Sequence, residues 1–544
     1  MLGQRTLTVW KEWHFKSVST LSFKSPLTGY TLRFFPKIDY RHRQGEQFEH
    51  YSLQNYPTLE EDKRHRYFNL PSHSFTADVE SRYEMEQKLA KVGSWGGFFY
   101  YYSRRNESGQ QELYNLHLLE EDEPTDLPEW TLPSVHNWRE LTMDISNSFH
   151  RTVTEDNHKI STGPSFGNDL KKSGVLSLSC SWNLQRHRGK DTRTFQEVGK
   201  RFQFFNAELF YQKYWRRQLV ITEEHISDGI IARYNFEHEV PPTGYLFDVR
   251  DDSRPLAVTL GNAGLHIAKV HNLRLSYSRI ASLRKQSVNV DYHFRKTDNA
   301  IAMGYSYNPQ TGVYTYRPEN VDGNWTSSLS VRYNQPFGEQ QRWNVTSETG
   351  WDYNHSVDIV NRQFSTVRNH GLREKASVFW NMGDRGRISL KATALWQMAD
   401  SEREDYRRRN TWDLQYGPDI SLKLPHDLHF STVFSICQRR GYDDRSMNDT
   451  ELVWDASLNW DFDFRRSSYF RYEMEEGFDH KVAGTGARPW TLRITCHDLL
   501  KQLSNTRRVI NAQGITETWY NSVPAYVMLH LCYRFTKQPK NRNR

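Results

Sequence analysis

The feature that most constrains the fold is an alternation of side-chain character with a period of two. In the segment Tyr526–Phe535 the odd-numbered positions are apolar or aromatic: Val527, Leu529, Leu531, Tyr533 and Phe535. The even-numbered positions are mixed: Met528, His530, Cys532 and Arg534. A strand places successive side chains on opposite faces, so the segment predicts a strand between lipid and a wet interior. As the last strand of a barrel it must pair with a first strand, because lipid tolerates no open sheet edge.

The same alternation recurs along the chain from about residue 170 onward. It is clearest in four segments: Leu176–Leu184, Val288–Phe294, Ile388–Met398 and Trp454–Phe464. A helix would scatter these apolar residues around its axis, so the period predicts strands. In the N-terminal third we expect strands at Thr20–Phe23, Tyr30–Phe35, Ser74–Tyr83 and Ser94–Ser103, and solvated loops at Pro57–Arg66 and Glu120–Asp126.

Composition agrees with a barrel better than with membrane helices. Only 37% of the 544 residues are apolar, the mean hydropathy is −0.83, and we find no run of about 18 apolar residues. A β-barrel needs none, because only alternate strand residues meet lipid. Aromatic residues make up 14% of the chain, a surplus that interfacial girdles would use. A soluble all-β protein with large cores remains the alternative on composition alone.

The connections between the expected strands alternate in length. Short turns are expected at Lys296–Asn299, Pro336–Gln340, Asn381–Gly386 and Pro425–Asp427. Longer polar loops are expected at Asn308–Asn324, Tyr353–Gly371, Asp400–Asn410 and Gln438–Thr450. Outer-membrane barrels have short periplasmic turns and long outer loops, whereas a sandwich or propeller has no reason to keep that parity. With the C-terminus in the periplasm, Arg465–Ala487 becomes periplasmic and Asp498–Ser522 an outer loop.

These observations together predict one large antiparallel transmembrane β-barrel. At about 25 residues for a strand and its connection, the chain supplies roughly 20, and up to about 22, strands. A barrel this wide cannot fill its lumen with its own side chains. It must therefore be plugged or leak, and selectivity would lie in its outer loops or in a plug.

Signals for other classes of function are weak. The four cysteines stand far apart, and His42, His65 and His187 lie between arginines, so no metal site or cofactor is expected. Gly163–Gly167 fits the Gly-x-Ser-x-Gly pattern, but no helical period follows it and we expect a turn, not a catalytic serine. The net charge of +7 is spread along the chain and predicts no nucleic-acid partner.

The densest charged loop is the candidate ligand-contacting site. Its candidate residues are Arg403, Tyr406, Arg407, Arg408 and Arg409. They could contact a ligand or lipopolysaccharide. The alternative is a loop kept soluble by its charges, which is the commoner role of such a run.

Several stretches resemble the outer-membrane β-barrel family of Bacteroidetes-type TonB-dependent receptors. They are Pro255–Leu265 with Val270–Leu273, Thr311–Val313 with Arg317–Trp325, Leu424–Leu428 with Arg439–Tyr442 and Trp454–Leu458, and Asp498–Leu500 with Tyr526–Leu529 and Tyr533–Phe535. Gly261, Asn262 and Leu265 match the family's Gly-Asn-Pro-x-Leu-Lys-Pro-Glu segment, while residues 266–268 depart from it. Their order and spacing over about residues 240–535 make the match specific.

The resemblance implies a receptor or transporter in the cell outer membrane for an unidentified nutrient. Its implied partners are outer-membrane lipid and lipopolysaccharide, the barrel-assembly machinery, and TonB with a plug domain or a surface lipoprotein. The barrel is expected to span residues 1–535, followed by a basic periplasmic tail at 536–544. No plug, TonB box or signal peptide is recognisable before the first strands, so we expect a truncated chain.

Two alternatives remain open: a passive or structural barrel that does not couple to TonB, and a secreted all-β carbohydrate-binding protein. In the barrel, Tyr533 and Phe535 would form the closure and assembly signal at the periplasmic interface, with Val527, Leu529 and Leu531 facing lipid.

Overall fold

The computed structural model describes most of the chain, in fifteen stretches of residues. These are 2–24, 31–54, 61–89, 92–119, 130–166, 174–193, 196–219, 224–254, 256–403, 406–443, 445–462, 490–502, 506–511, 514–519 and 525–533. Within them, no helix has the length and apolar character needed to cross a membrane.

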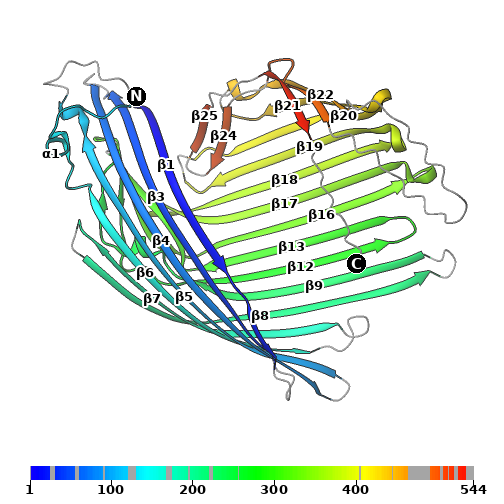
Figure 1. Cartoon of the computed structure of the whole chain (residues 1–544), viewed down its shortest axis with the longest axis horizontal. Coiled ribbons are helices and arrows are strands. Elements are labelled where there is room, and N and C mark those ends of the chain that lie inside the picture. The colour runs from blue at the N-terminus through cyan, green and yellow to red at the C-terminus, as the bar shows by residue number, and fades with distance from the viewer. Residues whose placement is uncertain are drawn as a thin grey trace, which may run out of the picture.

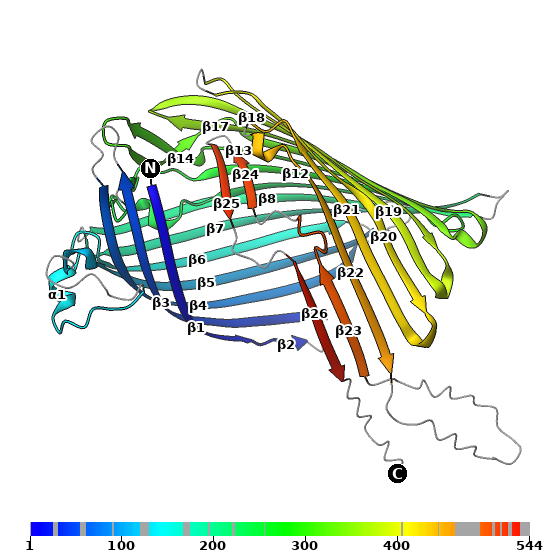
Figure 2. The ribbon, with the colours of Figure 1, turned by 90° about the horizontal axis from the view of Figure 1, so that it is seen from above.

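One sheet of 24 strands dominates the molecule and curls into a barrel-shaped wall (Figures 1 and 2). In its first half the wall strands are β1 (Leu2–Val18), β2 (Leu21–Lys24), β3 (Thr31–Gln54), β4 (Glu61–Leu89), β5 (Val92–Asn115), β6 (Phe149–Phe166), β7 (Val175–Asp191), β8 (Gln196–Leu219) and β9 (Glu224–Glu239). In its second half they are β12 (Ala268–Ala281), β13 (Gln286–Asp298), β16 (Asn324–Phe337), β17 (Trp343–Val360), β18 (Gln363–Asn381), β19 (Gly386–Ser401), β20 (Arg409–Leu424), β21 (Leu428–Arg440), β22 (Thr450–Phe462), β23 (Trp490–His497) and β26 (Tyr526–Tyr533). Each wall strand pairs with its neighbour in an antiparallel ladder. The predicted large antiparallel β-barrel is therefore confirmed.

The other elements are short. The strands β10 (Arg250–Asp251), β11 (Ala257–Leu260), β14 (Ala300–Asn308) and β15 (Val313–Val321) form a side branch in which β11 runs parallel to β15. A separate hairpin joins β24 (Thr506–Asn511) to β25 (Gly514–Trp519). The helical elements are η1 (Leu116–Leu119), α1 (Trp138–Thr142), η2 (Thr243–Leu246), η3 (Glu339–Gln341), η4 (Gly383–Arg385), η5 (Pro425–Asp427) and η6 (Arg445–Met447).

The two ends of the wall differ as the loop lengths predict. One end, here the turn end, carries the short connections 282–285, 338–342, 382–385 and 425–427 and the last residues of β26. The opposite end, here the loop end, carries the long connections 116–148, 240–267, 299–323 and 441–449. The family resemblance places the turn end in the periplasm and the loop end outside the cell.

Three expected connections are wrong in detail. Lys296–Asn299 is not a short turn: β13 leads there into the β14–β15 hairpin at the loop end. Tyr353–Gly371 is not a long loop, because β17 and β18 stay paired up to a tight turn at Asn361 and Arg362, which both have positive φ. Likewise, Glu61–Arg66 already belongs to β4. In each case the strands continue beyond the apolar stretch, where side-chain polarity no longer marks a strand.

Two segments of the expected organisation lie wholly outside the described residues: 465–487 and the expected loop at 120–126. The tail 536–544 lies outside them as well. Residues Gly163–Phe166 end strand β6, so the expected turn there is wrong, and the strand-to-helix geometry of a catalytic serine is absent from these residues.

The ladder assigns each wall strand an outward and an inward face. On β16, β17 and β18, Leu329 lies opposite Trp351, which lies opposite Leu372. One residue along each strand the sequence changes to Ser330, Gly350 and Arg373. Apolar side chains on the first face are exposed, as at Leu390 with 60% of its surface accessible. An exposed apolar face opposite a polar one fits a wall between lipid and a wet lumen.

Aromatic side chains gather at both borders of the apolar face. At the turn end, Trp343 stacks with Phe337 at 6.3 Å and with Trp380 at 5.7 Å between ring centroids. Toward the loop end, Tyr353 lies 4.7 Å from Trp325 and 4.6 Å from His370. Since Trp343 and Tyr353 are about ten positions apart on one strand, the distance between the rows matches a strand that crosses a bilayer obliquely.

The last strand has the faces that its sequence predicts. Val527, Leu529 and Leu531 point outward and are 62–67% exposed, and His530 lies opposite Arg493 on the inward face. The ring of Tyr533 lies 4.7 Å from that of Trp490 in the turn-end row. Phe535 lies outside the described residues, so a closure role for Tyr533 and Phe535 stays a prediction.

The two edges of the wall run in the same direction. In the described residues β26 forms a ladder with β23, and β1 with β3, and no ladder joins β1 to β26. Because every step along the wall is antiparallel, both edge strands run from the loop end to the turn end. A direct seam between them would be parallel.

We predict that the two faces of β26 differ in their tolerance of charge. Leu529→Arg places a charge on the lipid face near the bilayer midplane and should destabilise the barrel by about 2–4 kcal/mol. His530→Arg on the inward face is the matched control and should have little effect. Denaturant unfolding from lipid vesicles measures both, and equal stabilities would contradict the assigned faces.

Candidate functional site: a polar lumen with a folded segment at its loop end

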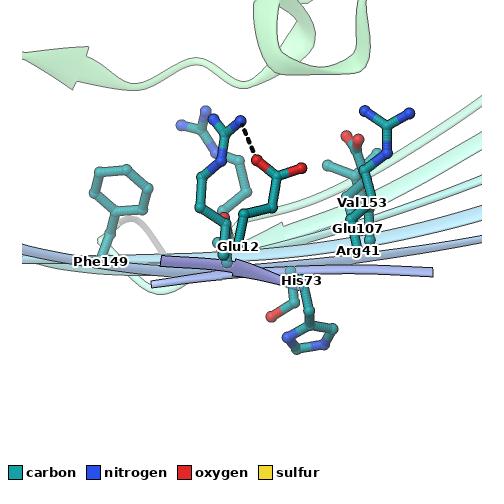
Figure 3. Close-up of a pocket in the computed structure, with 12 residues that line it drawn as sticks. Glu12, Arg41, His73, Glu107, Phe149 and Val153 are labelled. Atoms are coloured by element: carbon teal, nitrogen blue, oxygen red, sulfur yellow. Dashed lines mark hydrogen bonds and ion pairs between the residues drawn. The ribbon is translucent and has the colours of Figure 1, made fainter. Parts of the chain in front are cut away.

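The inward face of the wall is hollowed into cavities lined by charged and small polar side chains. One, of about 400 Å³, lies over strands β1 to β6 (Figure 3). In it Arg43 donates to the Glu12 carboxylate at 3.0 Å, and Arg41 and Glu107 stand on the same side of the sheet, whereas His73 points to the other side. The lumen wall is therefore wet and charged along its first strands.

A long connection at the loop end folds onto this inward face. It comprises residues 240–267 between β9 and β12, here called the mouth segment. Its helix η2 buries Leu246 in a cluster with Phe202 and Phe204 of β8 and Leu265. Its Phe247 lies so close to β7 that a Cβ on Gly189 would come within 2.4 Å of the ring, so only glycine fits there.

A buried ionic cluster pins the mouth segment to β6 and β7. The Asp191 carboxylate lies 2.8 Å from the Arg151 guanidinium and 3.2 Å from that of Arg193, and Arg193 reaches Asp251 of the mouth segment at 3.3 Å. The side chain of Asp191 is fully buried and that of Arg193 is 4% exposed. Burial alone would raise the pKa of Asp191, but the hydrogen bonds from Arg193 and Arg151 outweigh it and hold the pKa below its usual value.

The mouth segment makes further polar contacts across the lumen. The Thr243 hydroxyl donates to the Glu155 carboxylate at 2.7 Å and lies 2.9 Å from Nδ1 of His187. On β4, Arg66 donates to the Ser253 carbonyl, and its guanidinium lies 2.6 Å from the buried Glu49 carboxylate. The segment therefore touches inward-facing residues of β4, β6, β7 and β8 and covers this part of the lumen wall at the loop end.

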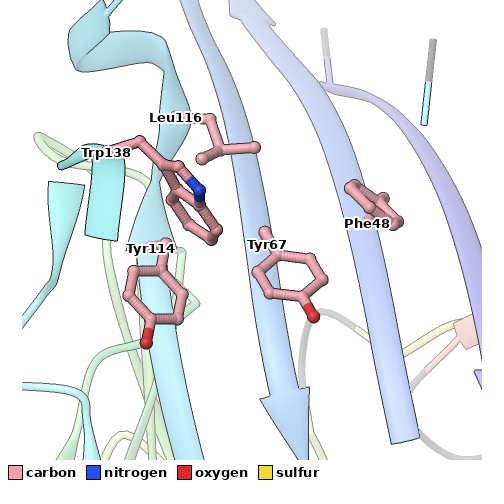
Figure 4. Close-up of a cluster of buried hydrophobic side chains, with 5 residues drawn as sticks. All are labelled: Phe48, Tyr67, Tyr114, Leu116 and Trp138. Carbon is pink, nitrogen blue, oxygen red and sulfur yellow. The ribbon is translucent and has the colours of Figure 1, made fainter. Parts of the chain in front are cut away.

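A second structure at the loop end covers the strands from the outside. The strands β3, β4 and β5 extend past the apolar band at the loop end, and there α1 and η1 pack against them (Figure 4). The cluster buries five side chains: Phe48, Tyr67, Tyr114, Leu116 and Trp138. Beside it, the rings of His50 and His65 stack at 3.7 Å, and Trp130 meets His50 edge-on at 5.0 Å. We call this group the outer clamp.

Histidine 65 makes the outer clamp sensitive to acid. Burial, with the neighbouring charges of His50 and His117, lowers the pKa of His65 from 6.5 to about 4. The folded clamp thus holds this imidazole neutral at a pH where an unfolded chain would protonate it.

The charged loop predicted to contact a ligand is held largely by partners within the chain. The Arg403 guanidinium lies 3.7 Å from the Asp358 carboxylate and 3.3 Å from the Tyr305 hydroxyl, with 13% of its side chain exposed. Arg403 and Arg409 both lie over the Tyr406 ring, at 5.5 and 5.4 Å.

The remaining loop arginines differ in accessibility. Arg409 lies 3.4 Å from Asp443, and Arg408 contacts the Met398 sulfur at 2.7 Å. Arg407 is 85% exposed and reaches Asp443 only at 4.0 Å. Arg407 is therefore the candidate residue with most surface for a ligand, and the ligand-contacting role of the loop stays a prediction.

Sequence reasoning missed the mouth segment and its ionic cluster. Asp191, Arg151 and Asp251 are far apart in the chain, and no local spacing signals their contact. The segment Pro255–Leu265 carried the family resemblance, which was the one hint that this connection is structured. In the described stretches, no group of three or more His, Cys, Asp or Glu residues could hold a metal ion.

The curled antiparallel wall, its apolar outward face and its polar lumen define a membrane β-barrel. Residues 225–417 match the model of the outer membrane protein beta-barrel family. With the barrel-shaped wall, this match indicates that the protein is a β-barrel of the outer membrane. This location contradicts the alternative of a secreted binding protein. A search of curated proteins finds no matching sequence.

Solved structures match most of the chain at low sequence identity. The copper transporter OprC matches at 7% identity and a TM-score of 0.36, covering 92% of this chain and 76% of that one. The siderophore receptor PirA from Pseudomonas aeruginosa matches at 10% identity and a TM-score of 0.29, covering 84% and 80%. FpvA of P. aeruginosa, bound to pyoverdines, matches at 8% identity and a TM-score of 0.35, covering 98% and 71%.

We predict that Asp191→Asn releases the mouth segment. The substitution leaves two arginines beside a buried site without their carboxylate, which should lower the local opening free energy by on the order of 3 kcal/mol. Amide hydrogen exchange of residues 243–265 should then accelerate roughly a hundredfold.

The matched control is Asp252→Asn, because Asp252 is 43% exposed and pairs with an exposed Arg250 at 3.3 Å. Its exchange should stay close to that of the wild type. Unchanged exchange in Asp191→Asn would show that the cluster does not hold the segment.

We also predict that acid loosens the outer clamp. Because the pKa of His65 is lower in the folded clamp than in an unfolded chain, its contribution is fully present above about pH 6.5 and is lost as the pH falls toward about 4. Protease cleavage within 130–148 should therefore accelerate between pH 7 and pH 4.5, and His65→Gln should weaken this pH dependence. An equally steep dependence in the variant would exclude His65 as the cause.

Proposed function

We propose that this protein is an outer-membrane receptor or transporter whose solute path is the polar lumen, gated by the mouth segment. The observation that carries the proposal is the mouth segment itself, which lies on the inward face of β4 to β8 at the loop end and is pinned there by the Asp191 cluster. A purely structural barrel has no need of a charged lumen with a separately held segment folded into its loop end. A solute path needs both a wet wall and an element that narrows it.

Coupling to TonB is part of the proposal through the family resemblance of the motifs between residues 240 and 535. On this view the barrel comprises residues 1–535, with a basic periplasmic tail at 536–544. A plug domain, TonB or a surface lipoprotein would act with it, lipopolysaccharide would surround it, and the barrel-assembly machinery would insert it. Among the loop candidates, Arg407 offers the most exposed surface for an incoming ligand.

The second candidate function is a passive barrel that does not couple to TonB. Its support is the polar, hollowed inward face of β12 to β19, along which a small solute could pass without an energy source. Uptake in cells with and without TonB separates the two, because only the coupled receptor loses uptake when TonB is removed.

Replacing residues 242–264 with a short Gly-Ser linker should widen the path. In proteoliposome swelling assays we expect the variant to admit neutral sugars at least about threefold faster than the wild type, with the largest gain for the largest sugar. Equal rates for all sugars in the two proteins would contradict gating by the mouth segment. Absence of swelling in both would contradict a solute path through the lumen.

A further inference from the structure

Two adjoining cavities in the lumen wall of β12 to β19 concentrate charge. They have volumes of about 390 and 460 Å³, and both are lined by Glu348. Five basic side chains line them: Arg274, Arg332, Arg373, Lys375 and Lys391. Three carboxylates line them: Asp291, Glu348 and Asp352. The cavities therefore carry an excess of positive charge.

Part of this charge is neutralised within the wall. The Arg332 guanidinium lies 3.6 Å from Asp291 and 3.9 Å from Glu348, so it serves two of the three carboxylates. Asp291 also accepts a hydrogen bond from the Ser276 hydroxyl at 2.7 Å. Lys391 donates to Asp419 of β20.

The other basic groups are left without such partners. In the described part of the chain, Arg274, Arg373 and Lys375 make no ion pair within 4.0 Å and no side-chain hydrogen bond. Asp352 is likewise unpaired there, so the unpaired charges that line the cavities are three cations and one carboxylate. All three cations are exposed to the lumen.

The floor of the cavity between Arg274 and Arg373 combines small residues with His293, Asp291 and Asp352. In the register, Arg274 lies opposite His293, which lies opposite Ser328, and Arg373 lies opposite Gly350, which lies opposite Ser330. A Cβ on Gly350 would meet nothing nearer than 3.9 Å. Arg274 on β12 and Arg373 on β18 thus stand at the two sides of this cavity, and Ser328, Ser330 and Gly350 leave room between them.

We propose that this cavity binds an anionic group of the solute, with Arg274 and Arg373 on its two sides and Lys375 adding charge beside it. Guanidinium groups pair with carboxylate or phosphate oxygens through two parallel hydrogen bonds, so either oxyanion fits. The field of three unpaired cations also draws anions into the lumen. The inference rests on the proposed solute path and adds the chemical class of the solute.

Calorimetric titration of the full chain, folded in detergent, tests the site without requiring transport. Citrate serves as the carboxylate probe and inorganic phosphate as the phosphate probe. The wild type should bind at least one of them, and the tighter-binding probe assigns the oxyanion. R274Q/R373Q should weaken binding at least about tenfold, whereas R274K/R373K, which keeps both charges, should retain part of it.

The matched control is R295Q, because Arg295 faces the same lumen outside the two cavities and already pairs with Glu239 at 2.6 Å. Its affinity should stay within about twofold of the wild type. Failure of the wild type to bind either anion, or undiminished binding by R274Q/R373Q, would overturn the assignment. Sugar flux in swelling assays without anion binding refutes this site alone, whereas anion binding without any flux refutes the solute path.

Discussion

The requirement that every backbone N–H and C=O find a partner inside the protein governs this structure. Lipid offers no hydrogen bonds, so the membrane-crossing strands must satisfy one another. The unbroken antiparallel ladder from β1 to β26 meets that requirement along the wall. Because the ladder satisfies the backbone, only the lipid-facing side chains need to be apolar. A chain of mean hydropathy −0.83 can therefore span a membrane. The edge strands β1 and β26 run in the same direction, and no ladder joins them in the described residues.

Outside the apolar band the chain folds by the rules of soluble proteins. The outer clamp buries aromatic side chains, and the mouth segment packs Leu246 and Phe247 against β8 and β7. The buried ionic cluster fixes the position of the mouth segment more than it adds to the free energy of unfolding. The reason is that desolvation of Asp191 offsets much of its attraction to the arginines. The loop end is therefore where this barrel carries separately packed parts, and a segment held inside the loop end is what the proposed gate requires.

The strand faces could be predicted from the sequence, because they follow from its period of two. Contacts between residues far apart in the chain could mostly not be predicted. The faces of Tyr526–Tyr533 are confirmed, because lipid imposes them on the local sequence, and so are the short turns near 338–342, 382–385 and 425–427. The loop at 353–371 and the turn at 296–299 were wrong, since strands beyond the bilayer no longer need an apolar face. The charged loop was found by its charge density, but the pairing of Arg403 with Asp358 depends on residues brought together only by the fold.

The central claim is that alternate residues of one strand face lipid and water. Site-directed labelling on β16 tests it most directly, in a background with Cys180, Cys437, Cys496 and Cys532 replaced by serine. A fluorophore at Leu329→Cys should be quenched by brominated lipid and resist water-soluble quenchers, and one at Ser330→Cys should show the reverse. The same quenching pattern at both positions, or the opposite assignment, would contradict the barrel described here.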